Sequence, residues 1–199
     1  MKLALSHCLF FFALSTNFFV VKALAHEVKQ KNVERRAVEI PIHEFTLLDQ
    51  NAKEFQFSKL AGRVAVVAFA YTTCPDVCPL ITAALRQVQN SLAAHERKKV
   101  FLLTITTDPE IDSPKVLAGY AKRYGADFAN WSFLTGDQAT LQAVWKNFGV
   151  GVKRKGRGLV DHTPLTAVVD GQGKMRVAYI GPGPDAKMVL RDVRGLLAR

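Results

Sequence analysis

Cysteine is scarce in this sequence, since the 199 residues contain three, at positions 8, 74 and 78. So few cysteines exclude a small disulfide-rich scaffold, in which several bridges compensate for a small core. Internal repeats and low-complexity segments are also lacking, which excludes a repeat architecture. Hydrophobic residues make up 49% of the chain, as in a globular protein with a real core. The length suits one ordinary domain plus an appendage.

The first residues contain an apolar stretch with almost no charge, over residues 3–21. A basic start at Met1-Lys2 and the small-residue sequence Ala23-Leu24-Ala25 complete the pattern of an export signal, predicted over residues 1–25. The alternative is an uncleaved membrane anchor, because about 20 apolar residues can span a bilayer. Polar residues within the stretch favour cleavage. The sequence therefore predicts an exported, periplasmic protein, with attachment to the inner membrane as the alternative.

Acidic residues are outnumbered, 17 against 27 lysines and arginines, which gives a formal charge of +10. Clusters such as residues 153–155 predict a basic surface that suits acidic partners or lipid head groups. Export makes nucleic acid an unsuitable partner. Residues 26–37 are charged and without apolar periodicity, so they are predicted to be a tether. The folded domain is then expected over residues 38–199.

The rest of the chain alternates strand and helix patterns, which predicts an α/β fold: a mixed sheet flanked by helices, with an N-terminal hairpin extension. The hairpin is expected at residues 45–57, with its turn at 49–51. Helices are expected to start at Ser113-Pro114 and after Asp137, both of which suit helix N-termini. The other expected elements are buried strands at 63–72 and 100–107, a helix at 79–98, a short strand at 131–135, a Gly-rich basic loop at 149–162, a hairpin turning at 171–173 and a closing helix at 185–198.

Cys74 and Cys78 would be the two cysteines left after removal of the signal, in the sequence YTTCPDVCP. They follow a predicted buried strand and precede a predicted helix, where open α/β sheets place their sites. Pro79 suits a first helical turn, which puts Cys78 near the positive end of the helix and favours its thiolate. A structural disulfide is the alternative, but a loop of about five residues gives only about 2 kcal/mol. A second alternative is two inert buried cysteines. The pattern favours a reactive pair, either a redox couple or a soft-metal site.

Two thiolates select Cu(I) among biological metals, and a nearby imidazole would also allow Cu(II). Among the histidines, His162 is distinctive because it follows the Gly-rich loop and precedes a predicted strand. A lone histidine in such a place is most often a solvated loop residue. The residues alone therefore leave its role as a ligand open.

Three segments in order, YTTCPDVCP, TDPEIDSPKVLAGYAKRYG and VDHTPLTAVVDGQGK, resemble the Sco/SenC family of copper chaperones for cytochrome c oxidase assembly. The resemblance runs from about residue 42 to the C-terminus. It implies a thioredoxin-like fold and a copper site formed by Cys74, Cys78 and His162. It also implies the copper-bearing subunit of cytochrome c oxidase as a partner. Asp76 and Asp108 match positions typical of the family, without an implied ligand role.

The sequence departs from the family at Thr73, where many members have histidine, in the basic loop 149–161, and at Pro164. In thioredoxin-like disulfide reductases a proline, usually cis, precedes the corresponding strand and faces the cysteines. Pro164 is therefore predicted to follow a cis bond beside the cysteine motif. This supports a rival function, a thiol–disulfide oxidoreductase that uses Cys74 and Cys78 as its catalytic redox pair on an oxidase subunit or another client. Both functions need an external thiol reductant. A peroxiredoxin-like peroxidase is disfavoured by Tyr71, where the T-x-x-C signature of those enzymes has threonine.

Overall fold

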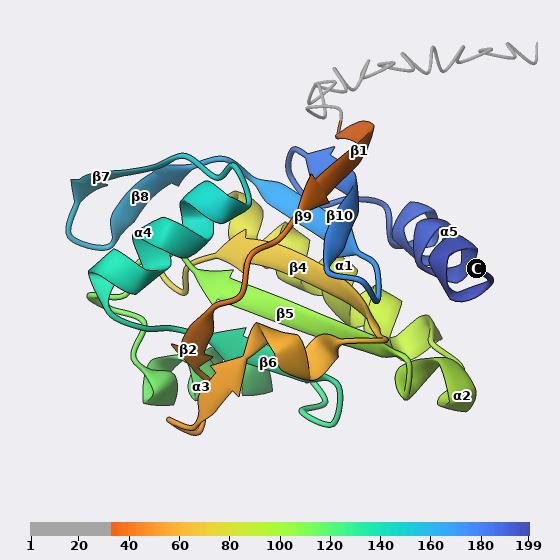
Figure 1. Ribbon diagram of the computed structural model, residues 1–199. Coiled ribbons are helices and arrows are strands. Elements are labelled where there is room, and N and C mark those ends of the chain that lie inside the picture. Colours follow the sequence, from red (N-terminus) through yellow and green to blue (C-terminus); the bar gives the residue numbers. More distant parts are fainter. Residues whose placement is uncertain (1–32) are drawn as a thin grey trace, which may run out of the picture. The chain divides into compact units, whose positions relative to one another are not determined.

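The computed structural model describes residues 33–199; the predicted signal over 1–25 and residues 26–32 of the predicted tether lie outside the described residues. A six-stranded mixed sheet forms the centre of this part of the chain, in the order β1-β10-β9-β4-β5-β6 (Figure 1). Its strands are β1 (Glu34–Pro41), β4 (Val64–Ala70), β5 (Val100–Thr106), β6 (Trp131–Leu134), β9 (Leu165–Val169) and β10 (Lys174–Ile180).

Within residues 33–199, two small hairpins and five α-helices surround the sheet. The strands β4, β5 and β6 run parallel to one another, whereas β9 is antiparallel to β4. The remaining elements are β2 (Thr46–Leu48), β3 (Glu54–Gln56), η1 (Phe57–Leu60), α1 (Val77–Ser91), α2 (Ala94–Arg97), α3 (Pro114–Arg123), α4 (Gln138–Asn147), β7 (Val152–Gly156), β8 (Leu159–His162) and α5 (Ala186–Leu197).

The sheet is buried on both faces, because side chains alternate along each strand. In β4, Val64, Val66 and Ala68 pack on one face with residues of α1, α3 and α5. Val67 and Phe69 pack on the other face with α4, η1 and the β2–β3 hairpin. Figure 1 shows α4 in front of the sheet and α1 behind it. The predicted mixed sheet flanked by helices, with a hairpin near its start, is confirmed.

Several predicted helix starts are confirmed by their caps. Ser113 caps α3 and Asp137 caps α4, because each side chain accepts a backbone N–H from the first turn. The helix after the cysteine motif differs from the prediction: α1 begins at Val77, with Asp76 as its cap residue, and a second helix, α2, follows. Cys78 therefore lies inside the first turn of α1 instead of at its cap.

The domain begins earlier than predicted. Residues 34–37, expected within the charged tether, form the start of β1, which pairs antiparallel with β10. Almost all side chains of β1 are exposed. Strands at a sheet edge can have charged residues on both faces, so apolar alternation does not reveal them. The predicted boundary at residue 38 is corrected to Glu34.

Most of the predicted basic loop at 149–162 is also ordered, as the antiparallel hairpin β7–β8. Gly158 makes its turn in the left-handed region, with φ of 72°. The exposed lysines and arginines of this hairpin hide the strand pattern in the sequence. Within residues 33–199, no helix combines the length and the apolar content that crossing a membrane requires.

Candidate metal site

The two cysteines lie at the carboxyl end of β4, where the parallel strands of the sheet end. Both are free thiols. Cys78 is fully buried, with 0% exposure, against Tyr71 and Val160, whereas Cys74 is half-buried in the loop before α1. The sequence therefore located the motif correctly. Its two sulfur atoms differ in their access to solvent.

His162 lies at the same end of the sheet, although it is far from the cysteines in the sequence. Because β9 runs antiparallel to β4, its first residue lies at the edge where β4 ends, and His162 comes three residues before β9. The Nε2 atom of His162 lies 3.7 Å from the Cys78 sulfur. The other ring nitrogen, Nδ1, lies 3.0 Å from the carbonyl oxygen of Thr163. Because a carbonyl can only accept, Nδ1 carries the proton and Nε2 presents its lone pair to the thiols.

The site favours a thiolate at one cysteine and a neutral imidazole. The adjacent Cys78 thiol lowers the pKa of Cys74 to about 5, against the opposing effect of burial. The nearby Cys74 and burial together raise the pKa of Cys78 above its ordinary value. Burial lowers the pKa of His162, so its imidazole is neutral at pH 7. At neutral pH the site thus contains one thiolate, one thiol and one unprotonated imidazole nitrogen.

An open pocket of about 520 Å³ connects Cys74 and His162 to solvent, whereas Cys78 does not line it. Cys74, His162 and Pro164 line it together with Asp76 and Lys155. In the part of the chain that the structure describes, no three cysteine, histidine, aspartate or glutamate side chains are gathered closely enough to hold a metal ion as they stand. Cys78 and His162 already meet and Cys74 lines the same pocket, so a small rearrangement of these side chains would complete a three-ligand site.

The predicted cis bond before Pro164 is wrong, because all peptide bonds among residues 33–199 are trans. The predicted position of Pro164 is right, since it lines the pocket with Cys74. The trans backbone is held by hydrogen bonds on both sides: Leu165 N–H donates to the Thr163 carbonyl, and Gly181 N–H donates to the Pro164 carbonyl.

Supporting residues around the site were not predicted. Tyr71 packs edge-on against the His162 ring, with centroids 5.9 Å apart. Asp112 is fully buried and accepts hydrogen bonds from both the backbone N–H and the hydroxyl of Thr72. Burial raises the pKa of Asp112. The sequence signal for this contact was the second aspartate of TDPEID. The sequence does not reveal that Thr72 is the partner of this aspartate, because the contact spans 40 residues.

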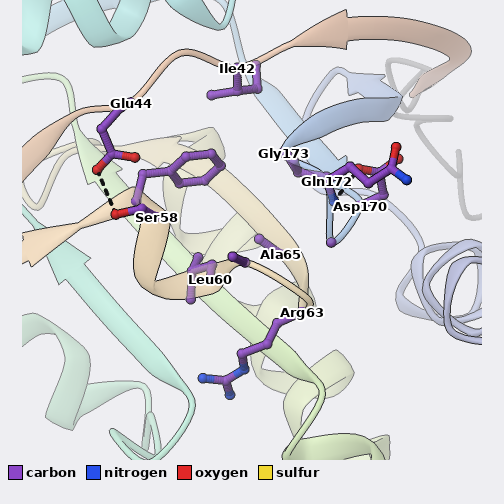
Figure 2. A pocket seen from close by; sticks show the side chains of 13 residues that line it. Ile42, Glu44, Ser58, Leu60, Arg63, Ala65, Asp170, Gln172 and Gly173 are labelled. Atoms are coloured by element: carbon purple, nitrogen blue, oxygen red, sulfur yellow. Dashed lines mark hydrogen bonds between the residues drawn. The ribbon is translucent and has the colours of Figure 1, made fainter.

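A second cavity, of about 210 Å³, lies at the opposite end of β4 (Figure 2). It is bordered by the turn between β9 and β10 on one side, and by Glu44, which accepts a hydrogen bond from Ser58, on another. Its lining is apolar at Ile42, Leu60 and Ala65 and contains neither thiol nor imidazole. Soft-metal chemistry therefore belongs to the cysteine end of the sheet.

Known proteins share this fold and much of this sequence. The SCO1 protein homolog of Bacillus subtilis is 34% identical over 143 residues, which are 70% of this chain and 74% of that protein. BsSco, described as a member of the Sco family of cytochrome c oxidase assembly proteins with a disulfide switch, is 27% identical. Its structure superposes with a TM-score of 0.70, covering 83% of this chain and 98% of that one. Yeast Sco1 with copper bound is 26% identical, with a TM-score of 0.68 and coverage of 80% and 89%.

The family comparison covers nearly the whole described part of the chain. The sequence profile of the SCO1/SenC family matches residues 33–198. This span includes the cysteine motif, the hairpin β7–β8 and His162, and it begins just before β1. The resemblance inferred from three short motifs is thereby confirmed, and so is the thioredoxin-like fold. The chain belongs to the SCO1/SenC family.

Proposed function

We propose that this protein is an exported copper chaperone that binds copper through Cys74, Cys78 and His162. Its client is the copper-bearing subunit of cytochrome c oxidase, whose binuclear copper centre it helps to assemble. The observation that carries the proposal is the 3.7 Å approach of His162 Nε2 to the Cys78 sulfur, with Cys74 lining the same pocket. Copper-bound yeast Sco1 and the oxidase-assembly role stated for BsSco support it.

The donor set fits copper in either oxidation state. Two thiolates are soft ligands that suit Cu(I), and a nitrogen donor extends the range to Cu(II). The bond from Nδ1–H to the Thr163 carbonyl fixes the ring, as outer partners of metal-binding histidines commonly do. Copper is cargo here, so the open pocket beside Cys74 gives a partner's ligands a route to the metal. The half-buried Cys74 is the ligand that a partner can displace first.

The location follows from the predicted signal over residues 1–25. Export leaves Cys74 and Cys78 as the cysteines of the mature protein, in an oxidising compartment. An external thiol reductant is needed to keep the pair able to bind copper. Retention of the N-terminal segment as a membrane anchor would hold the domain near the oxidase through the short charged tether.

A thiol–disulfide oxidoreductase is the second candidate. The observation that favours it is the unequal pair of thiols: Cys74 is accessible and has a pKa of about 5, whereas Cys78 is buried and protonated. This is the arrangement of an attacking and a resolving cysteine. The trans bond at Pro164 removes one reason for preferring this function. The disulfide switch described for BsSco fits either function.

The two functions are separated by titrating the reduced protein with Cu(I) and Cu(II) beside a disulfide-reductase assay on the same sample. We expect His162→Ala to weaken Cu(II) binding strongly and Cu(I) binding much less, because Cu(II) favours nitrogen ligands. The disulfide should still form. Cells with this variant should lose oxidase assembly despite an intact cysteine pair.

His95→Ala is the matched control, since His95 is exposed on α2. It should bind both copper ions as the unchanged protein does. If Cu(II) binding and oxidase assembly both survive His162→Ala, then His162 is not a ligand and the oxidoreductase becomes the better explanation.

A further inference from the structure

The hairpin β7–β8 presents His162 but is lightly attached to the domain. Its apolar attachment consists of Val160, in the small cluster around Tyr71 and Cys78, and of the partly buried Val152, which packs against this cluster and the main core. The turn is tied to the cysteine loop by one hydrogen bond, from the Thr73 hydroxyl to the Gly158 carbonyl. On the opposite side, a cleft of about 620 Å³ lies between β7 and α4. Part of that side of the hairpin therefore faces open space instead of α4.

A buried ion pair anchors β7 beside this cleft. Arg154 Nη2 donates to Asp108 Oδ1 at 2.5 Å. Asp108 is 0% exposed and follows the end of β5, whereas Arg154 is 31% exposed. A second ionic contact joins Arg154 to Glu110 at 3.2 Å. A buried carboxylate without its cationic partner is strongly unfavourable, so the pair holds Arg154 close to the loop after β5.

The register of the hairpin links this anchor to the proposed ligand. Arg154 is paired with Val160 across the two strands, and Val152 is paired with His162. Residues two apart in a strand point to the same face and lie about 6–7 Å apart. A displacement of Arg154 therefore moves the strand that is hydrogen-bonded directly to β8. The position of His162 depends on where β7 is held.

The loop after β5, which contains Asp108, also holds the segment that precedes the cysteines. Its last residue, Asp112, binds the backbone N–H and the hydroxyl of Thr72, two residues before Cys74. The first half of the loop holds β7 through Asp108. Residues 108–112 thus bridge the two segments that bring the thiols and the imidazole together.

We propose that the Asp108–Arg154 ion pair is a positioning lock for His162, with Arg154 the positioning residue. Without it, the packing of Val152 and Val160 keeps the hairpin attached but no longer fixes His162 Nε2 against the Cys78 sulfur. The inference deepens the proposed copper site and rests on His162 being a ligand there. It predicts that Cu(II) binding depends on a residue that does not touch the metal.

The test compares four variants with the unchanged protein: Arg154→Gln, the neutral pair Asp108→Asn/Arg154→Gln, the conservative Arg154→Lys, and the control Lys153→Gln. Lys153 is exposed on the same strand, so its substitution changes the net charge equally. Hydrogen exchange of the metal-free, reduced protein reports on the hairpin. Titrations with Cu(I) and with Cu(II) report on the ligands.

We expect Arg154→Gln and the neutral pair to lower Cu(II) affinity about 10–100-fold, the range for lost outer-shell partners, and Cu(I) affinity much less. Amides of β7 and β8 should exchange faster, while those of β4 and β5 stay protected. Arg154→Lys should restore most of both properties, because it keeps the charge. Lys153→Gln should behave as the unchanged protein.

Several outcomes would contradict the proposal that the ion pair positions His162. One is unchanged hydrogen exchange and unchanged Cu(II) affinity in the neutral pair, which would mean that the remaining contacts of the hairpin, at Val152, Val160 and Gly158, position it without the ion pair. Another is an equal effect of Lys153→Gln, which would indicate net charge as the cause. If Arg154→Gln fails to fold, the neutral pair decides, because it leaves no buried carboxylate unpaired. Undiminished Cu(II) binding by His162→Ala would instead refute the proposed ligand set. The hydrogen-exchange data would still show whether the Asp108–Arg154 ion pair holds the hairpin in place.

Discussion

At the scale of single residues, the pKa values of the two motif cysteines shift in opposite directions because their surroundings differ. Cys78 is enclosed by apolar side chains in the first turn of α1, and burial disfavours its charge. Cys74 lies outside the helix and faces the pocket. The Cys78 thiol stabilises the Cys74 thiolate. Each cysteine thus sets the protonation of the other, in the manner of coupled titrating pairs.

This asymmetry predicts selective alkylation of Cys74. Its pKa of about 5 means that the thiolate is present above that pH and is lost by protonation below it. The rate of reaction with iodoacetamide should therefore stay high down to about pH 6 and fall near pH 5, while Cys78 stays unreactive. Peptide mapping by mass spectrometry measures both rates.

Cys78→Ala is the informative comparison for this prediction. It removes the largest cause of the low pKa at Cys74, so the midpoint of the rate profile should rise toward the ordinary cysteine value of about 8.5. A midpoint near that value in the unchanged protein would show that the thiolate is not stabilised by its neighbour.

At the scale of elements, helix α1 joins the site to the core. Ile81, Leu85 and Val88 recur on one face and are buried against the sheet, whereas Leu80 is 54% exposed. Such spacing is typical of a helix with one apolar stripe. Because Cys78 belongs to the first turn, the packing of this stripe also fixes the depth of its sulfur.

Two leucines on α1 provide a matched test of this packing. Leu85 has 0% exposure, so Leu85→Ala should lower the free energy of unfolding by about 2–5 kcal/mol through lost burial and a cavity. Leu80→Ala removes the same atoms from an exposed position and should change it by less than about 0.5 kcal/mol. Urea denaturation followed by circular dichroism measures both. Equal losses would contradict the assigned helix face.

At the scale of the whole domain, local sequence patterns located the cysteines, whereas only the family resemblance brought His162 to the same site. The cysteine motif could be placed because β4 is a continuous apolar run, which marks a buried strand and its end. The contact of His162 with Cys78 spans 84 residues and depends on β9 running antiparallel to β4. Local patterns do not encode that pairing. β1 and the β7–β8 hairpin escaped prediction because strands at edges expose charged side chains and show no apolar alternation.

A long-range ion pair predicts how the stability of the domain depends on pH. Glu96, in α2, contacts Arg194, in α5, at 2.7 Å and also accepts the Ala93 N–H. Arg194 is the largest cause that lowers the pKa of Glu96 to about 2, from an ordinary value of 4.5. The folded state therefore gains stability from ionised Glu96 above about pH 4.5, and loses it as the pH falls toward 2.

Glu96→Gln should lower the melting temperature at pH 7 modestly, because Arg194 is 51% exposed and solvent screens the pair. The difference from the unchanged protein should shrink below pH 4.5, as unfolded Glu96 becomes protonated, and vanish only below about pH 2, where folded Glu96 is protonated too. Added salt should reduce it at pH 7. Glu54→Gln, at an exposed position on β3, is the control and should leave the melting temperature unchanged throughout. A difference between Glu96→Gln and the unchanged protein that persists well below pH 2 would mean that Glu96 does not stabilise the domain through its charge.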